Sequence, residues 1–139
     1  MVDDLRVAMV SSLAALKAQS TRLRVVSENL ANASSTAAAA GGTPYVRKTI
    51  TFKGELDRAS GASIVLIDAI GIDRSAFRIE HDPGHPAADA AGNVKFPNVN
   101  PLVELADLRE AHRSYDANLQ VIRQTRDMVG DLIDLLRGK

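Results

Sequence analysis

The chain has 139 residues, about the size of one domain, and its 17 basic and 17 acidic side chains give a formal net charge of zero. This balance argues against a protein whose main task is to bind nucleic acid, and the absence of cysteine excludes disulfides, thiol catalysis and zinc–thiolate sites. No apolar run approaches the roughly 20 residues that span a bilayer, so direct membrane insertion is not expected. The first residues also lack the pattern of a cleaved secretory signal.

The first predicted element is one amphipathic helix from about residue 5 to 32, a stretch without proline or glycine. Apolar residues recur there every seven positions, at Met9, Leu16, Leu23 and Leu30. This spacing is typical of a coiled-coil seam, although the companion positions Ser12 and Gln19 are polar. We therefore expect the helix to present an apolar stripe to a partner.

The middle of the chain, from about residue 33 to 99, predicts a connector followed by short strands. Serine, threonine, alanine and glycine dominate its first residues, which favours a flexible connection. Alternating or β-branched patterns predict strands at residues 45–52, 63–72, 75–80 and 94–96. Two prolines and two glycines between Asp82 and Asn93 predict turns, so we expect one small antiparallel β module.

A second long helix is predicted from Asn100 to the C-terminus. Asparagine caps helices well, and Pro101 suits the first helical position. Apolar residues again recur every seven positions, at Leu108, Tyr115, Ile122, Val129 and Leu136. A second seam is predicted through Leu105, Leu119 and Ile133.

The predicted fold class is α+β, with long N- and C-terminal helices paired as an antiparallel coiled-coil-like hairpin and a small antiparallel β insert. The corresponding segments are residues 1–33 and 100–139 for the two helices, with the connector and β module at 34–99. A pair of helices buries only one stripe of each. The pattern therefore fits either an ordinary α+β monomer or a subunit that completes its core against neighbours.

Several polar residues have more than one interpretation. Asn29 and Asn32 either end the first helix or form hydrogen bonds between subunits. Tyr115 reads as core, whereas Arg113 and Asn118 either link neighbouring helices or form a solvated face.

No chemistry of an enzyme is predicted. Four side chains of metal-ligand type lie close together: His81, Asp82, His85 and Asp89. Their spacing matches no recognised zinc pattern, and the prolines and glycine among them predict a turn instead. No nucleophile–base pair stands out and Gly41-Gly42 starts no phosphate loop, so we expect neither a catalytic site nor a cofactor.

Three stretches resemble the flagellar basal-body rod protein family. The run from Asp82 to Asn100 is similar to the signature of its proximal members, through Asp82, Pro83, Gly84, Pro86, Asp89, Gly92, Asn93, Pro97, Asn98 and Val99. Another stretch is similar to a motif shared by rod and hook proteins, through Asn29, Leu30, Ala31 and Asn32. A further stretch is similar to the family's C-terminal helix, through Arg113, Ser114, Tyr115 and Asn118. Residues 37–42 depart from the family pattern, which has a tighter turn before Tyr45.

This resemblance implies a structural subunit that passes unfolded through the flagellar type III apparatus and polymerises into the proximal rod within the periplasm. The rod would transmit torque from rotor to hook. Implied partners are copies of the chain in a helical assembly, other rod subunits, and proteins of the rotor and export-gate junction. The expected subunit-packing residues are Leu16, Leu23, Leu30, Leu108, Tyr115, Ile122 and Val129. The alternatives are another rod or rotor-junction adaptor, or a helical adaptor that binds a soluble partner.

Overall fold

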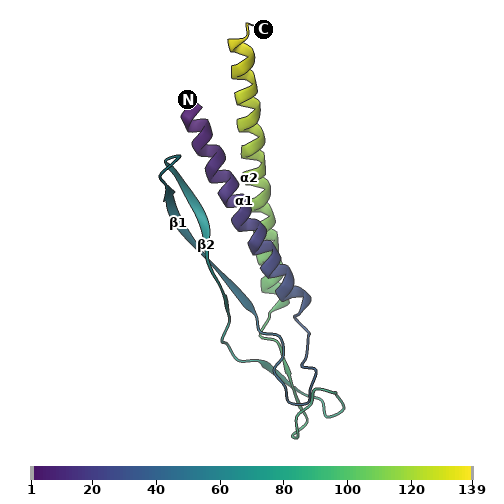
Figure 1. Ribbon diagram of the computed structural model, residues 1–139. Helices are drawn as coiled ribbons and strands as arrows, with labels where there is room; N and C mark the ends of the chain where they lie inside the picture. Colours follow the sequence, from purple (N-terminus) through teal and green to yellow (C-terminus); the bar gives the residue numbers. More distant parts are fainter. Residues whose placement is uncertain (1, 139) are drawn as a thin grey trace. The chain divides into compact units, whose positions relative to one another are not determined.

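The computed structural model describes residues 2–138 and confirms the α+β class. Its elements follow the chain as α1 (Val2–Ala31), β1 (Lys48–Asp57), β2 (Ala62–Ile72), β3 (Arg78–His81), β4 (Asn93–Phe96) and α2 (Pro101–Leu136) (Figure 1). The chain forms two compact units. Unit 1 contains Met1–Leu23, Thr51–Ala69 and Glu110–Lys139, and unit 2 contains Arg24–Ile50 and Ile70–Arg109.

The ends of both helices are fixed by local side chains. At the end of α1, the Asn32 side-chain amide donates to the Glu28 carbonyl oxygen at 2.9 Å, so Asn32 terminates the helix. Its backbone is not left-handed, because positive φ angles in the described residues occur only at glycines. At the start of α2, Asn100 Oδ1 accepts the Leu102 N–H at 3.1 Å and Pro101 takes the first helical position, as predicted.

The two helices run antiparallel in each unit. In unit 2, the Asn29 amide near the end of α1 bonds to the Glu104 carboxylate near the start of α2 at 3.1 Å. In unit 1, Leu5 near the start of α1 shares a hollow with Met128 and Leu132 near the end of α2. The predicted helical hairpin is therefore confirmed. Neither helix, over the described residues, is long and apolar enough to cross a membrane.

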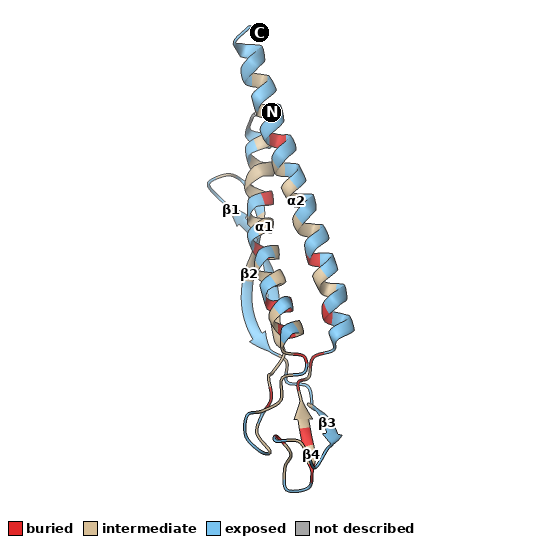
Figure 2. Ribbon diagram, turned by 90° about the vertical axis from the view of Figure 1, so that its right-hand side faces the viewer, coloured by how far each residue is buried: buried red, intermediate tan, exposed pale blue. Residues whose placement is uncertain are grey.

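The buried residues of the helices are mostly small or polar. They are Ser12, Ala18, Val25, Val26 and Asn29 on α1, and Glu104, Ala111 and Thr125 on α2. On α2 they keep the predicted period of seven, but in a different phase from the leucine series. Small side chains allow the backbones to approach closely, which leaves the larger residues at the flanks. Figure 2 shows these buried positions as isolated patches on otherwise half-buried or exposed helices.

The predicted seams accordingly lie at the edges of the buried stripe. Every expected subunit-packing residue is half-buried: Leu16, Leu23, Leu30, Leu108, Tyr115, Ile122 and Val129. The second seam on α2 is not buried within the chain at its two ends, where Leu105 is 41% exposed and Ile133 is 43% exposed. The physical reason is that the interior positions of α2 belong to Glu104 and its successors, one residue away from the leucine line.

The strands form two separate two-stranded sheets rather than one module. β1 and β2 make a hairpin whose turn is closed by a 2.7 Å bond from the Gly61 N–H to the Asp57 carbonyl oxygen. β3 and β4 pair antiparallel, with Arg78 opposite Phe96 and His81 opposite Asn93. The strand predicted at residues 75–80 begins later, at Arg78, because the Ser75 N–H is used in a turn with Asp73 Oδ1 at 2.8 Å.

The connection between β3 and β4 needs a glycine at position 92. Gly92 is buried and has φ +79°, and an added Cβ would lie 2.9 Å from His81 Cε1 and 3.0 Å from Pro83 Cγ. An L-side chain is disfavoured at this angle, and contacts this short force neighbours to move.

Gly92→Ala is expected to lower the free energy of unfolding by about 1–3 kcal/mol, because backbone strain and a steric clash act together. The matched control is Gly61→Ala, since Gly61 has φ +71° but open space around the added Cβ. Urea titration followed by circular dichroism measures both variants. An equal loss in the two would contradict the steric contribution at Gly92.

Candidate functional site

A cluster of hydrogen-bonded polar side chains in unit 2 connects both helices to the strands. We call it the polar cluster, and its members are Asn29, Tyr45, Arg47, Lys48, Asp73, Asn98 and Glu104. It includes one residue from each of two of the three sequence motifs, Asn29 and Asn98. It lies where α1 ends, β1 begins and α2 starts.

Asn29 is at the centre of this cluster and is only 1% exposed. Its side-chain oxygen accepts the Lys48 N–H at 2.8 Å and the Tyr45 hydroxyl at 2.9 Å. Its amide nitrogen donates to the Lys48 carbonyl at 2.9 Å and to Glu104 Oε2 at 3.1 Å. An asparagine amide has two donors and an oxygen with two lone pairs, so this side chain uses its full capacity. Asn29 therefore does not terminate α1, which corrects one of its two predicted roles.

Glu104 has a fully buried side chain, and Arg47 supplies the opposite charge. The Arg47 Nε–H donates to Glu104 Oε1 at 2.6 Å. Burial works to lower the pKa of Arg47, but the hydrogen bond and charge of Glu104, together with Asp73, outweigh it and raise that pKa. A buried carboxylate without such partners would be strongly destabilising, so the pair fixes α2 against the segment before β1.

Tyr45 is held as a hydrogen-bond donor. Burial raises the pKa of its hydroxyl, and the negative charges of Glu28 and Glu104 raise it further. The phenol therefore stays protonated at neutral pH and donates to Asn29. Glu28 in turn forms an ion pair with Lys48, so the end of α1 contacts the start of β1 through two neighbouring side chains.

Asp73 and Asn98 extend the cluster to the segment between β2 and β3. Arg47 Nη1 lies 3.4 Å from Asp73 Oδ2, and the Arg47 N–H donates to Asn98 Oδ1 at 2.9 Å. Hydrogen bonds from the Ser75 backbone and hydroxyl lower the pKa of Asp73, and Arg47 lowers it further. The ion pair is partly exposed and so contributes less than the one with Glu104.

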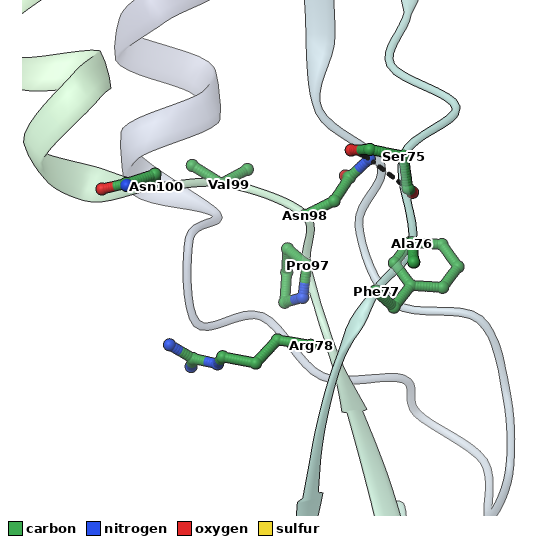
Figure 3. A pocket seen from close by; sticks show the side chains of 8 residues that line it. All are labelled: Ser75, Ala76, Phe77, Arg78, Pro97, Asn98, Val99 and Asn100. Atoms are coloured by element: carbon green, nitrogen blue, oxygen red, sulfur yellow. Dashed lines mark hydrogen bonds between the residues drawn. The ribbon is translucent and has the colours of Figure 1, made fainter.

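Asn98 also borders a shallow hollow of about 270 Å³ between the segments that flank the β3–β4 sheet (Figure 3). Its amide donates to the Ser75 carbonyl and hydroxyl, each at 3.2 Å. Arg78 lies over the Phe96 ring, with its guanidinium carbon 5.0 Å from the centroid. These polar groups serve the fold of unit 2, and their arrangement is that of a structural joint rather than a reaction centre.

The acidic and histidine side chains of the turn after β3 cap its backbone. Asp82 Oδ1 accepts the Gly84 N–H at 3.2 Å, and His85 Nδ1 accepts the Ala87 N–H at 3.0 Å. Asp89 Oδ1 accepts the N–H groups of Ala91 and Asn93, each at 2.9 Å. These bonds support the turn interpretation. Within residues 2–138 no three His, Asp or Glu side chains converge in a way that could hold a metal ion.

The connector rich in alanine and glycine packs on this same turn. The Gly41 N–H donates to the Ala87 carbonyl at 3.1 Å, and Gly41 has φ +68°. An added Cβ would lie 3.5 Å from the Asp89 Cβ. The predicted departure from the family pattern therefore has a definite conformation.

The structure brings only some of the predicted motif residues together. Asn29 and Asn98 come together in unit 2 through the backbones of Lys48 and Arg47. The third motif lies on the part of α2 that belongs to unit 1, where Asn118 donates to the Ser114 carbonyl at 2.8 Å.

Sequence reasoning missed Arg47, Asp73 and the pairing role of Glu104. No local pattern reports the inward position of Glu104, because the interior line of α2 through Glu104 and Ala111 is known only from their burial in the structure. Its partner could not be identified, because Arg47 is 57 residues away in the chain.

Comparison with known proteins agrees with the family resemblance of the sequence motifs. Residues 5–38 match the family described as "Flagella basal body rod protein", and residues 90–135 match "Flagellar basal body rod FlgEFG protein C-terminal". A relative from Agrobacterium fabrum is 58% identical over 137 residues, covering 99% of both chains. Relatives from Salmonella typhimurium and Bacillus subtilis are 38% and 37% identical, and cover 83% and 89% of this chain and 85% and 93% of their own.

A helical pair with a polar joint and these matches define a structural protein of the flagellar basal-body rod and not an enzyme. All three relatives carry the name flagellar basal-body rod protein FlgC. The chain belongs to this FlgC family.

Glu104→Ala is expected to lower the free energy of unfolding by about 3–5 kcal/mol, because it leaves the Arg47 charge and the Asn29 amide without their buried partner. The control is Glu110→Ala, an exposed position on the same helix, with an expected change within about 0.5 kcal/mol. Chemical denaturation of the purified chain measures both. The double variant Arg47→Met with Glu104→Leu should be less destabilised than the sum of its two single variants. A loss equal to that sum would contradict the coupling between Arg47 and Glu104.

Asp73→Asn is expected to weaken the acid dependence of stability. The folded-state pKa of Asp73 lies below its ordinary value of 3.8, so its contribution is complete above that pH and disappears as pH falls towards the lower folded-state pKa. Unfolding free energies measured from about pH 5 to pH 2 should therefore fall less steeply in this variant. Asp68→Asn, at an exposed carboxyl on β2, is the control. Identical pH profiles for wild type and Asp73→Asn would exclude this role.

Proposed function

We propose that the chain polymerises through its terminal helices into the proximal part of the flagellar rod. In this role it would transmit torque from the rotor to the hook within the periplasm, after export by the flagellar type III apparatus. The proposed neighbours are copies of the chain, other rod subunits and proteins of the rotor and export-gate junction. The 1–33 and 100–139 segments would form the assembly core, with 34–99 as connector and spacer.

The observation that carries this proposal is the number of large apolar side chains that α2 leaves in solvent. Those more than two-fifths exposed are Leu102, Val103, Leu105, Val121, Met128, Ile133, Leu135 and Leu136. Val121, Met128 and Leu135 follow one another at intervals of seven, so they form a stripe on one face. Contiguous exposed apolar surface marks protein–protein contacts. Together with the half-buried leucine seams, this stripe gives α2 more than one contact face.

The half-buried seam residues support the same role. A charge at Leu23 or Ile122 would meet a flank that is already partly packed within the chain, so it would affect both folding and assembly. The more exposed leucines separate these effects. We also propose that both helices become fully ordered on assembly. Complete amide-exchange protection of both helices in the isolated chain would contradict that coupling.

Leu102→Asp is expected to abolish swimming in a strain that lacks the natural subunit, while the purified protein keeps its stability within about 0.5 kcal/mol. Leu102 is 77% exposed, so its substitution costs little inside the chain but places a charge in a contact between subunits. Motility agar and the recovery of basal bodies measure assembly.

The matched control is Gln124→Asp, which makes the same charge change at an exposed polar position of α2. It should swim normally. Normal swimming by Leu102→Asp, or basal bodies that incorporate it at the wild-type level, would count against the helix-packing proposal. A discrete complex with one soluble protein, with no motility defect on deletion, would favour the adaptor alternative.

A further inference from the structure

Unit 1 contains an apolar groove between α1 and the β1–β2 hairpin. Its floor is formed by Ala14 and Ala18 of α1 and by residues 65–67 of β2, and it encloses about 370 Å³. Lys17 and Lys53 add positive charge on its two sides. Small residues on the helix keep the hollow open, because larger ones at these positions would fill it. The groove therefore suits an apolar side chain that has a carboxylate close to it on the same surface.

The end of α2 has this chemistry. We call residues 131–136 the α2 tip. Leu135 is 74% exposed and Leu136 is 89% exposed, and Asp131 and Asp134 are exposed beside them. Residues three and four apart share one face of a helix, so Asp131, Asp134 and Leu135 point to the same side. The tip presents two negative charges around an apolar side chain.

We propose that the groove of one copy binds the α2 tip of a second copy. Leu135 would enter the apolar hollow, and Asp131 and Asp134 would face Lys17 and Lys53. Lys53 lies 3.7 Å from the exposed Glu55, a surface pair weak enough to exchange for a carboxylate of the partner. The inference rests on the proposed polymeric function and identifies one contact within it.

The tip of the same copy cannot fill the groove. That tip lies beside Leu5, with which Asp131 and Leu135 share a separate hollow. Ala14 is nine residues further along α1, which is about 13 Å along a helix axis. The occupant must therefore come from another chain. A contact between two different surfaces of identical subunits can repeat along an open helical polymer, provided that the rotation between successive subunits does not close it into a ring.

The experiment uses the absence of cysteine from the natural sequence, so any disulfide reports an introduced position. Full-length Val65→Cys, carrying an affinity tag, is mixed with full-length Leu135→Cys under mild oxidation. The mixed dimer should exceed that obtained with Ala69→Cys by about tenfold, because docking raises the local concentration of the two thiols. Ala69 is exposed on the same strand and lies outside the groove.

Charge reversal tests the proposed pairing. Lys17→Glu with Lys53→Glu in the groove copy should lower the mixed dimer roughly fivefold to tenfold. Adding Asp131→Lys with Asp134→Lys to the tip copy should restore it. This rescue separates lost pairing from lost folding, since a misfolded groove could not be repaired from the other chain.

These experiments distinguish a failure of the groove contact from a failure of the proposed polymeric function. Equal dimer yields at Val65→Cys and Ala69→Cys would overturn the inference, and so would failure of the charge rescue. In cells, cross-linking of Val65→Cys to a different rod protein but not to Leu135→Cys would also overturn it. If Leu102→Asp still blocks motility in any of these cases, the proposed polymeric function survives without this contact. If the cross-link forms but Leu102→Asp swims normally, the contact stands and the wider helix-packing proposal fails.

Discussion

The buried carboxylate of Glu104 is the constraint on which the geometry of unit 2 depends. A charge with no solvent contact is tolerated only when opposite charge and hydrogen-bond donors surround it. Arg47 supplies the charge at 2.6 Å and Asn29 supplies an amide donor at 3.1 Å. These three residues come from α1, the segment before β1, and α2. One electrostatic requirement therefore fixes the mutual position of three segments, and Asn98 and Asp73 carry that fixation on towards β3.

The helices bury small and polar residues and expose large apolar ones. Ala18, Ala111 and Thr125 occupy interior positions that let the helices approach, and Glu104 occupies another. The leucine series then falls on the flanks, where it is only half-buried. In an isolated monomer this arrangement leaves apolar side chains in contact with water. For a structural component of the flagellar basal-body rod it leaves side chains available for neighbouring subunits.

The polar run after β3 is a scaffold for a turn. Asp82, His85 and Asp89 each accept backbone N–H groups of residues two to four positions later. Gly92 gives the turn the backbone angle it needs, and Gly41 brings the connector onto it. The residue types that suggest a metal site are thus used to satisfy backbone donors, which a tight turn cannot satisfy by secondary structure.

The sequence motifs by themselves indicated a structural family without catalysis. The sequence also determined the two long helices, the cap at Asn100 and the strand that ends at Phe96. These features depend on residues within about four positions of one another, or on a period that a helix repeats along its length. Only the tertiary structure decided that Asn29 is the centre of a hydrogen-bond network and that Glu104, rather than the leucine line, faces inward. Asn29 and Glu104 are separated by 75 residues, and no local pattern reports a contact formed only when distant segments fold together.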